Sequence, residues 1–327
     1  MILESGTTDP LKLLPMKYPW AYQHYKVGVG NTWTPSEAAM QNDIELWKSD
    51  RLTEAERRVI LWNLGFFSTA EGLTANNIIL TLYHHIKDPA CRMYMIRQTF
   101  EEANHIDSFI YIIESLNLDS DYVYNMYKTI PSIKEKDDFV VSLTENIIDN
   151  NFDATKDPLG LMQDLIGYYV ILEGILFYSG FSMMCALKNK NQMVGVGEQF
   201  DWIRKDEAVH VAFGVDLINT IKEEYKGVWT KPIQEQVRNN IERAVGLEEK
   251  YVDDCCPVSF AGIPNKLYKD YVRYIADYRL NRLGLKELYK VDNPFPWMSK
   301  LNELNKEKNF FEARPNEYAM GTLEDWD

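Results

Sequence analysis

The sequence predicts an all-α fold, and three features of it support that prediction. From Ser36 onward, apolar residues recur at steps of three and four, the spacing of helices that bury one face. Alternating β-branched runs are few, and no two of them form a convincing strand pair. Prolines stand at or near the start of several periodic stretches, where helices tolerate them best. Together these features predict a bundle of long helices.

The expected helices follow one another through connections rich in Pro, Asp, Asn or Gly. Their predicted ranges are 53–85, 89–116, 137–148, 158–188, 191–225, 232–255 and 264–283. Two stretches fall outside this pattern, one rich in aromatic and turn residues and one with mixed charge and little periodicity. We therefore divide the chain into an N-terminal arm (1–35), a helical bundle (36–288) and a flexible C-terminal tail (289–327).

One predicted helix is apolar enough to resemble a membrane span. Apart from Gly, Ser and Glu173, all side chains of residues 165–187 are apolar. A carboxylate near the centre of a span costs roughly 2.5–3.5 kcal/mol on insertion scales, and the sequence has no second span to shelter it. A helix that is apolar on every side can instead be the centre of a soluble bundle. The sequence favours that buried helix.

Charge and cysteine content narrow the class of protein. The chain has 35 basic and 49 acidic side chains and a net charge of −14, which argues against nucleic acid or an anionic membrane as a partner. Its four cysteines follow no metal-binding spacing, and the first residues lack the profile of a secretory signal. We expect a cytoplasmic protein without disulfides.

A coarse duplication places carboxylates and imidazoles at matching intervals. Glu71 is followed 31 residues later by Glu102-x-x-His105, and Glu173 is followed 34 residues later by Glu207-x-x-His210. Residues three apart share one helix face, so each pair can hold one ion or two adjacent ions. Acidic residues are 49 of 327, so about one histidine in seven has an acid at this spacing by chance. Singly, these residues could be solvated glutamates or core histidines, but six together point to a shared site.

Apolar neighbours predict that this cluster is buried. Those on the two Glu-x-x-His faces are Phe100, Ile106, Phe109 and Ile113 in the first copy and Ile203, Phe213 and Leu217 in the second. Four buried carboxylates are costly unless positive charge compensates them, and few lysines or arginines share these faces. One Glu from each of two helices and Glu-x-x-His from two others is the ligand pattern of di-iron and di-manganese bundles. Such ligands suit Fe(II) or Mn(II), since their negative charge stabilises higher oxidation states.

Seven segments resemble the small subunits of class I ribonucleotide reductases, across about residues 14–318. They are NTWTPSE (31–37), DIELWKSDRL (43–52), FFSTAEGLTANN (66–77), FEEANHIDSF (100–109), LEGILFYSGF (172–181), RKDEAVHVAFG (204–214) and NPFPWMS (293–299). The resemblance implies a ferritin-like bundle and a homodimer. It also implies a radical-generating subunit that activates O2 at a dinuclear metal centre, so that a large subunit can reduce ribonucleotides to deoxyribonucleotides. The implied metal ligands are Glu71, Glu102, His105, Glu173, Glu207 and His210.

The resemblance also implies roles for residues around the ligands. Trp33, Asp206 and His105 would form a hydrogen-bonded chain that carries an oxidising equivalent away from the metals. Phe177 and Phe181 would line the oxygen pocket. Without the resemblance, Trp33 could equally be a core or lid tryptophan, and the two phenylalanines could be plain packing.

Some positions depart from most of the family. Phe109 stands where most members have the tyrosine that becomes a stable radical, and Glu71 stands where most have Asp. Both departures resemble the class Ic subgroup, whose manganese/iron centre stores the oxidising equivalent on metal. Two irons or two manganese ions fit the same ligands. Trp202 stands where that subgroup tends to have a tyrosine that passes an electron inward, although it could be plain packing.

The tail is the expected contact with the partner protein. Residues 303–327 mix charges with scattered aromatic and apolar residues, too irregular for a core of their own. By resemblance, the tail docks on the large (alpha) subunit and Tyr318 relays the oxidising equivalent between the chains. The alternative is a plain solvated tail.

Two other functions remain open on the same bundle. One is a two-metal oxidase or monooxygenase, and the other is an iron-storage protein, because a fold alone does not decide function. Trp33, Asp206 and Tyr318 favour the reductase subunit over both, since neither rival needs a route for a radical to leave the bundle.

Overall fold

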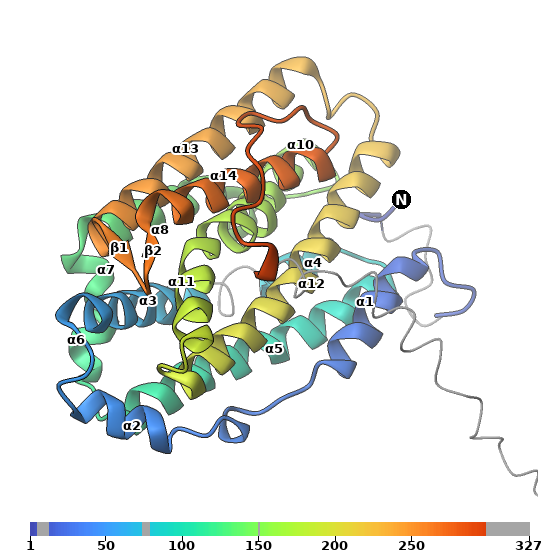
Figure 1. Ribbon diagram of the computed structural model, residues 1–327. Coiled ribbons are helices and arrows are strands. Elements are labelled where there is room, and N and C mark those ends of the chain that lie inside the picture. Colours follow the sequence, from blue (N-terminus) through green and yellow to red (C-terminus); the bar gives the residue numbers. More distant parts are fainter. Residues whose placement is uncertain (5–12, 74–78, 150, 299–327) are drawn as a thin grey trace, which may run out of the picture. The chain divides into compact units, whose positions relative to one another are not determined.

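Long helices build the larger of the two units into which the chain divides, Met1–Pro294. The computed structural model describes residues 1–4, 13–73, 79–149 and 151–298. The second unit, Phe295–Asp327, lies mostly outside these residues, so Tyr318 and the predicted tail from residue 299 onward lie outside the described residues. Within the described chain the all-α prediction is confirmed (Figure 1).

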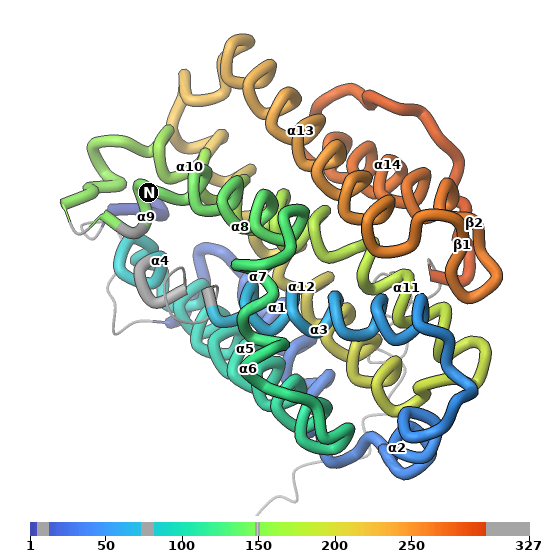
Figure 2. The backbone as a smooth tube through the Cα atoms, turned by 90° about the vertical axis from the view of Figure 1, so that its left-hand side faces the viewer, coloured from blue at the N-terminus to red at the C-terminus, as the bar shows by residue number. Residues whose placement is uncertain are grey.

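The helices differ widely in length. The longer ones are α3 (Glu54–Leu73), α5 (Pro89–Ser115), α12 (Val194–Glu224), α13 (Lys231–Cys255) and α14 (Asn265–Arg282). The shorter ones are α1 (Pro19–Gly30), α2 (Gln41–Lys48), α4 (Ile79–His85), α6 (Ser120–Tyr124), α7 (Met126–Thr129), α8 (Pro131–Leu143) and α9 (Glu145–Ile148), with a 3-10 turn at Pro35–Glu37. Helices α13 and α14 lie side by side in both views, and α5 contacts α12 (Figures 1 and 2).

A single apolar segment runs through the unit as three consecutive helices. It consists of α10 (Pro158–Leu165), a π-helix (Ile166–Leu176) and α11 (Tyr178–Asn189). It is long and apolar enough to cross a membrane, but its most apolar stretch is wholly buried inside the fold. The sequence therefore identified the buried centre of the bundle correctly. It did not predict the π-helix, because a stretch that is apolar on every side has no periodicity to reveal a widened turn.

Several element boundaries differ from the prediction. The arm contains α1, whose aromatic and glycine-rich sequence gives little amphipathic signal. The helix expected at 137–148 begins earlier, at Pro131 in the first turn, and ends at Leu143. There the hydroxyl of Thr144 donates to the carbonyl of Val140. The helix expected at 53–85 is observed as α3 and α4, on either side of residues outside the described chain.

One short strand pair was not expected. Strands β1 (Ser259–Phe260) and β2 (Ile263–Pro264) pair antiparallel, with Phe260 opposite Ile263. The turn between them places Ala261 at φ 51° and Gly262 at φ 72°, the left-handed conformations that close a tight hairpin. Two-residue strands are too short to show an alternating pattern, which explains why the sequence did not reveal them.

Candidate metal centre

Four helices bring the six predicted ligands together. Glu71 lies at the end of α3, Glu102 and His105 lie in the middle of α5, Glu173 lies on the π-helix, and Glu207 and His210 lie in the middle of α12. All six side chains are fully buried. Most of the predicted apolar neighbours surround the cluster, but the prediction is wrong for Phe100. This side chain is 50% exposed, and its ring packs against Arg97.

The six residues form two groups that share a carboxylate. Ligand atoms of Glu71, Glu102, His105 and Glu207 lie within 4.8 Å of one another, and so do those of Glu102, Glu173 and His210. Each cluster could hold one ion, so the arrangement fits two adjacent metal positions. This is the geometry that the duplicated sequence pattern predicts.

Two glutamates face both histidines and can bridge the two positions. Glu102 presents Oε2 at 3.7 Å from Nδ1 of His105 and Oε1 at 3.3 Å from Nδ1 of His210. Glu207 presents Oε1 at 3.3 Å from the first of these nitrogens and Oε2 at 3.3 Å from the second. Each carboxylate therefore offers one oxygen to each position.

The other two glutamates belong to one position each. Oε2 of Glu71 lies 3.5 Å from Nδ1 of His105, and Oε1 of Glu173 lies 3.9 Å from Nδ1 of His210. The centroids of the two imidazole rings are 5.9 Å apart. The centre is thus nearly symmetric in its ligands, with one imidazole and one unshared carboxylate at either end.

The electrostatics of the cluster call for positive charge. Burial raises the pKa of Glu102 and of Glu173 far above its ordinary value, and the neighbouring carboxylates raise it further. Burial opposes the charged form of His105, yet the surrounding carboxylates raise the pKa of that imidazole well above its usual range. Burial likewise opposes ionisation of Glu207, but His210 and His105 lower its pKa to about 2. Bound cations would replace the protons that this cluster otherwise requires.

Several ligand atoms also lack hydrogen-bond partners, as metal-binding atoms do. Nδ1 of His105, Oε1 of Glu207 and both carboxylate oxygens of Glu173 are buried without one in the described part of the structure. Such atoms are costly to bury unless something else satisfies them. The residues present therefore fit a pair of divalent cations.

A hydrogen-bonded chain leads from His105 to Trp33, as the sequence resemblance implies. The indole Nε1 of Trp33 donates to Oδ2 of Asp206 over 2.8 Å. The same oxygen lies 3.4 Å from Nε2 of His105. The indole and imidazole rings also stack, with centroids 6.1 Å apart.

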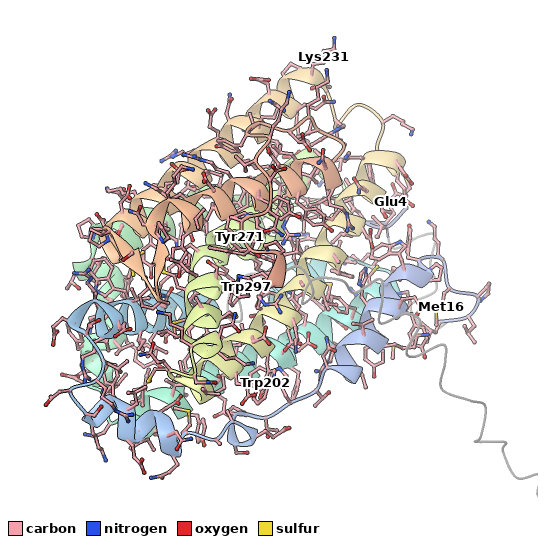
Figure 3. The ribbon with its side chains drawn as sticks, in the orientation of Figure 1. Glu4, Met16, Trp202, Lys231, Tyr271 and Trp297 are labelled. Carbon is pink, nitrogen blue, oxygen red and sulfur yellow. The ribbon has the colours of Figure 1, made fainter. Side chains whose placement is uncertain are left out.

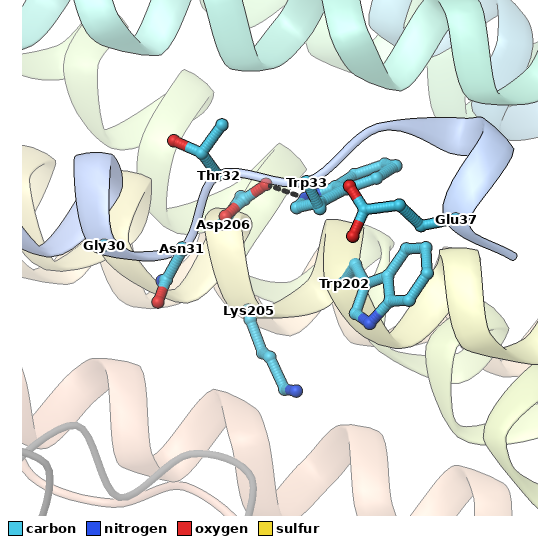
Figure 4. Close-up of a pocket in the computed structure, with 8 residues that line it drawn as sticks. All are labelled: Gly30, Asn31, Thr32, Trp33, Glu37, Trp202, Lys205 and Asp206. Carbon is cyan, nitrogen blue, oxygen red and sulfur yellow. Dashed lines mark hydrogen bonds between the residues drawn. The ribbon is translucent and has the colours of Figure 1, made fainter.

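Trp33 and Trp202 line a hollow next to these hydrogen-bonded residues. Their ring centroids are 5.2 Å apart, and Trp202 lies on α12 (Figure 3). The hollow has a volume of about 260 Å³, and Figure 4 shows its lining: Gly30, Asn31, Thr32, Trp33, Glu37, Trp202, Lys205 and Asp206. Trp33 therefore lies between this hollow and the buried imidazole, where an electron could enter or leave.

An aromatic wall contains the three predicted phenylalanines. Phe67 contacts all of them, with ring centroids 4.8 Å from Phe177, 5.0 Å from Phe181 and 6.1 Å from Phe109. All four side chains are fully buried. The wall therefore offers apolar surface and no ionisable group.

One residue at the centre escaped the sequence prediction. Glu101, which precedes the ligand Glu102, places Oε2 at 2.9 Å from Nε2 of His210. Its role mirrors that of Asp206, which precedes Glu207 and contacts His105. The signal was present in the sequence, because both copies of the motif carry an acid immediately before the ligand glutamate.

Sequence comparison decides the family. Residues 10–294 match the family model described as ribonucleotide reductase, small chain. The chain belongs to this family. It is 50% identical to the ribonucleoside-diphosphate reductase subunit beta of Chlamydia pneumoniae over 327 residues, which cover 99% of this chain and 94% of the relative. It is 28% identical to the subunit M2 of Danio rerio, over 95% of this chain and 76% of that one.

Solved structures agree with the assignment. The ribonucleotide reductase R2 subunit of Clostridium botulinum superposes with a TM-score of 0.82 and 25% identity, covering 93% of this chain and 95% of that one. The dimanganese(II) NrdF of Streptococcus sanguinis shares the fold, with a TM-score of 0.76 and 18% identity over 90% and 99% of the two chains. The ferritin-like bundle is thereby confirmed. So is the prediction of a class I ribonucleotide reductase small subunit.

Proposed function

We propose that this small subunit activates O2 at a dinuclear Mn/Fe centre and keeps the oxidising equivalent on metal until the large subunit uses it. The metal pair, when bound, supplies the redox chemistry that O2 activation requires. The protein would hold the pair with Glu102 and Glu207, together with Glu71 and His105 on one side and Glu173 and His210 on the other. Their complete burial excludes bulk water from the reacting centre.

The observation that carries the proposal is Phe109. This side chain is fully buried, and its ring centroid lies 5.6 Å from that of Phe200 in the aromatic wall. A phenyl ring has no hydroxyl proton to lose, so it cannot hold the radical that a tyrosine holds at this position in most of the family. Glu71 in place of Asp supports the same class Ic assignment.

A phenol does approach the centre from another side. The hydroxyl of Tyr168 lies 3.4 Å from Oε1 of Glu102 and accepts a hydrogen bond from Gln98 over 3.0 Å. Burial and the nearby carboxylates raise the pKa of this phenol well above its usual value. Any test for a tyrosyl radical therefore needs the Tyr168→Phe variant as a control.

Two tryptophans suit the transfer of electrons. Trp33 is joined to His105 through Asp206, and we assign to it the outward passage of the oxidising equivalent. We assign to Trp202 the inward passage of an electron during activation, because its ring lies against that of Trp33 and lines the hollow. Phe177 and Phe181 keep the O2 approach apolar in this proposal.

The subunit is proposed to act with a second copy of itself and with the large subunit. On α5, Ile96, Phe100 and Ile110 are exposed and recur at helical spacing, and Val29 of the contacting helix α1 is also exposed. We place the homodimer contact on this face. The tail, residues 289–327, would dock on the large subunit and present Tyr318 as the relay.

The proposed setting is the cytoplasm. All four cysteines are free and buried, which suits a reducing compartment. The net charge of −14 gives nucleic acid and anionic membranes no attractive surface, so protein partners and O2 are the expected ligands.

Metal analysis with electron paramagnetic resonance tests the proposal. Metal-free protein loaded with Mn(II) and Fe(II) under O2 should retain both metals, support nucleotide reduction with the large subunit and show no tyrosyl signal. A tyrosyl signal that scales with activity would contradict storage on metal, and its loss in Tyr168→Phe would locate the radical. Recovery of nucleotide reduction would also exclude a monooxygenase or an iron-storage protein.

A further inference from the structure

The two imidazoles of the centre are held by different outer partners, although their ligand sets match. Nε2 of His210 contacts Oε2 of Glu101 over 2.9 Å. The other oxygen of Glu101 accepts a hydrogen bond from Nε of Arg97, also over 2.9 Å. Arg97 then donates from a terminal nitrogen to the carbonyl of Gly28 in α1. The hydrogen bonds that start at His210 thus lead to a cation, the guanidinium of Arg97.

The corresponding series at His105 ends on a neutral ring. Oδ2 of Asp206 serves both His105 and the indole of Trp33. Oδ1 of Asp206 has no hydrogen-bond partner in the described part of the structure. In the part of the chain that the structure describes, no arginine or lysine forms an ion pair with Asp206, whose partner is His105. The acid at this end therefore lacks the guanidinium partner that Glu101 has.

We propose that Arg97 and Glu101 are a positioning pair for the His210 end, and that they make the two metal positions unequal in charge. This inference rests on the two-metal centre proposed above. The carboxylate of Glu101 fixes the orientation of the imidazole so that Nδ1 faces the metals. The guanidinium neutralises that carboxylate inside a site where charges are weakly screened.

The inequality has a chemical consequence for the direction of electron transfer. Both ends have an acid that contacts an imidazole, and among the described hydrogen bonds Asp206 also accepts from an oxidisable ring, that of Trp33. The carboxylate of Glu101 instead accepts from the guanidinium of Arg97, which is not readily oxidised.

Helix α1 holds this pair in place through a close approach at Gly28. A Cβ atom at Gly28 would lie 2.8 Å from Oε1 of Glu101 and 3.2 Å from Cγ of Arg97. Any larger residue would displace the carboxylate that contacts His210. A side chain at position 28 on α1 would therefore press on the carboxylate of Glu101 on α5.

Binding of Mn(II) alone to the metal-free, full-length chain tests the pair. Under anaerobic conditions, calorimetry should detect two equivalents for the wild type. Glu101→Gln keeps the shape of the side chain but removes its charge, and it should weaken one equivalent about 10- to 100-fold while leaving the other unchanged. Asp206→Asn should also weaken one equivalent. The double variant should then weaken both, because the two acids serve different ends.

Two glycine variants provide an independent measurement. Gly28→Ala should reproduce the selective loss seen with Glu101→Gln. Gly246→Ala is the matched control, because it also lies within a helix but a Cβ there would meet nothing within 4 Å. This pair decides the question if Glu101→Gln does not fold by circular dichroism.

The outcomes separate the pair from the centre. If the wild type fails to take up two Mn(II) ions, the proposed two-metal centre is wrong. If the wild type binds two and the Glu101 and Gly28 variants weaken both equally, or neither, the centre stands and the positioning pair is wrong. A purely structural role would lower the thermal stability without selecting one equivalent.

Discussion

Phe109 is the residue on which the proposed storage of the oxidising equivalent on metal depends. The ring sits in the aromatic wall between Phe67 and Phe200, beside the helix turn that carries His105. A tyrosine at position 109 would have the rings of Phe67 and Phe200 as neighbours. These two neighbours pack well against a ring but offer no hydrogen-bond partner to a hydroxyl.

We expect Phe109→Tyr to give no increase in turnover with the large subunit. A new phenol beside the metals would drain or quench an oxidant that is stored on metal. Turnover and electron paramagnetic resonance of the Mn/Fe-loaded variant measure this, and Phe200→Tyr adds the same hydroxyl elsewhere in the wall as a control. Faster turnover in Phe109→Tyr alone would contradict storage on metal.

Asp137 on α8 links stability to pH away from the centre. Burial raises the pKa of this half-buried carboxyl from 3.8 to about 7. The folded protein therefore keeps a proton that the unfolded chain has lost, so stability falls as pH rises from about 4 to about 7. Asp137→Asn should remove this loss, and its stability relative to the wild type should grow by on the order of 1–2 kcal/mol over that range.

Thermal unfolding of metal-free protein at pH 5 and pH 8 measures the Asp137 effect. Asp138→Asn is the control, because Asp138 carries the same charge next door but its side chain is 64% exposed and pairs with Lys134. A stability difference between Asp137→Asn and the wild type that does not change with pH would rule the assignment out.

The candidate ligands could be predicted from the sequence because a pair of residue types, Glu and His, recurs at the same spacing. Glu102 and His105 repeat as Glu207 and His210, and helical geometry converts that repeat into one site. Glu101 was missed because an acid beside a ligand glutamate is ordinary in a chain with this many acidic residues. Only the observed contact with His210 separates it from a solvated side chain.

At the scale of elements, the π-helix is the part of the fold that the sequence could not supply. It carries Glu173, and two buried cations donate to its carbonyls just after that residue. Arg279 donates to the carbonyl of Gly174 over 3.0 Å, and Lys136 donates to that of Leu176 over 3.0 Å. These donors come from α14 and α8, so the wide turn depends on tertiary contacts that no local pattern reveals.

Lys136 is expected to stabilise this element strongly. Its ammonium is fully buried, lies 2.7 Å from Glu248 and faces the rings of Phe66 and Tyr251. Lys136→Met leaves Glu248 as a buried charge without its cation and should cost roughly 3–5 kcal/mol. Adding Glu248→Gln should recover much of the stability, because the uncompensated charge is then gone.

Hydrogen exchange distinguishes support of the π-helix from simple charge pairing. In the Lys136→Met/Glu248→Gln double variant, amides from the π-helix to the start of α11 should still exchange faster than in the wild type, because Leu176 has lost its ammonium donor. Protection at the wild-type level there would show that Lys136 serves only to pair Glu248. Unfolding by urea supplies the stability comparison.

At the scale of the whole molecule, the bundle is the small subunit of an enzyme that also has a large subunit. It contains the candidate metal ligands and the hydrogen-bonded residues Trp33, Asp206 and His105 within Met1–Pro294, and small subunits of this family work with a large subunit. The sequence predicted the bundle because long periodic helices are its strongest signal. The tail and its partner were inferred only from resemblance, since a segment without periodicity encodes no contacts that can be read from one chain.

The tail prediction separates docking from electron relay. Truncation after Asn316 removes the last aromatic and apolar residues, which we propose as anchors on the large subunit, and it should abolish complex formation. Tyr318→Phe keeps the ring but removes the hydroxyl whose electron and proton can leave together. It should therefore bind the large subunit normally and permit metal oxidation, yet stop turnover.

Three measurements on the same samples decide this: binding to the large subunit, electron paramagnetic resonance after activation, and nucleotide reduction. Tyr278→Phe makes the same chemical change at an exposed phenol on α14 in the bundle unit, and it should leave turnover intact. The pattern of Tyr318→Phe, normal binding without reduction, has no explanation in docking alone. Near-normal reduction in that variant would remove Tyr318 from the route, even if truncation still prevents the complex from forming.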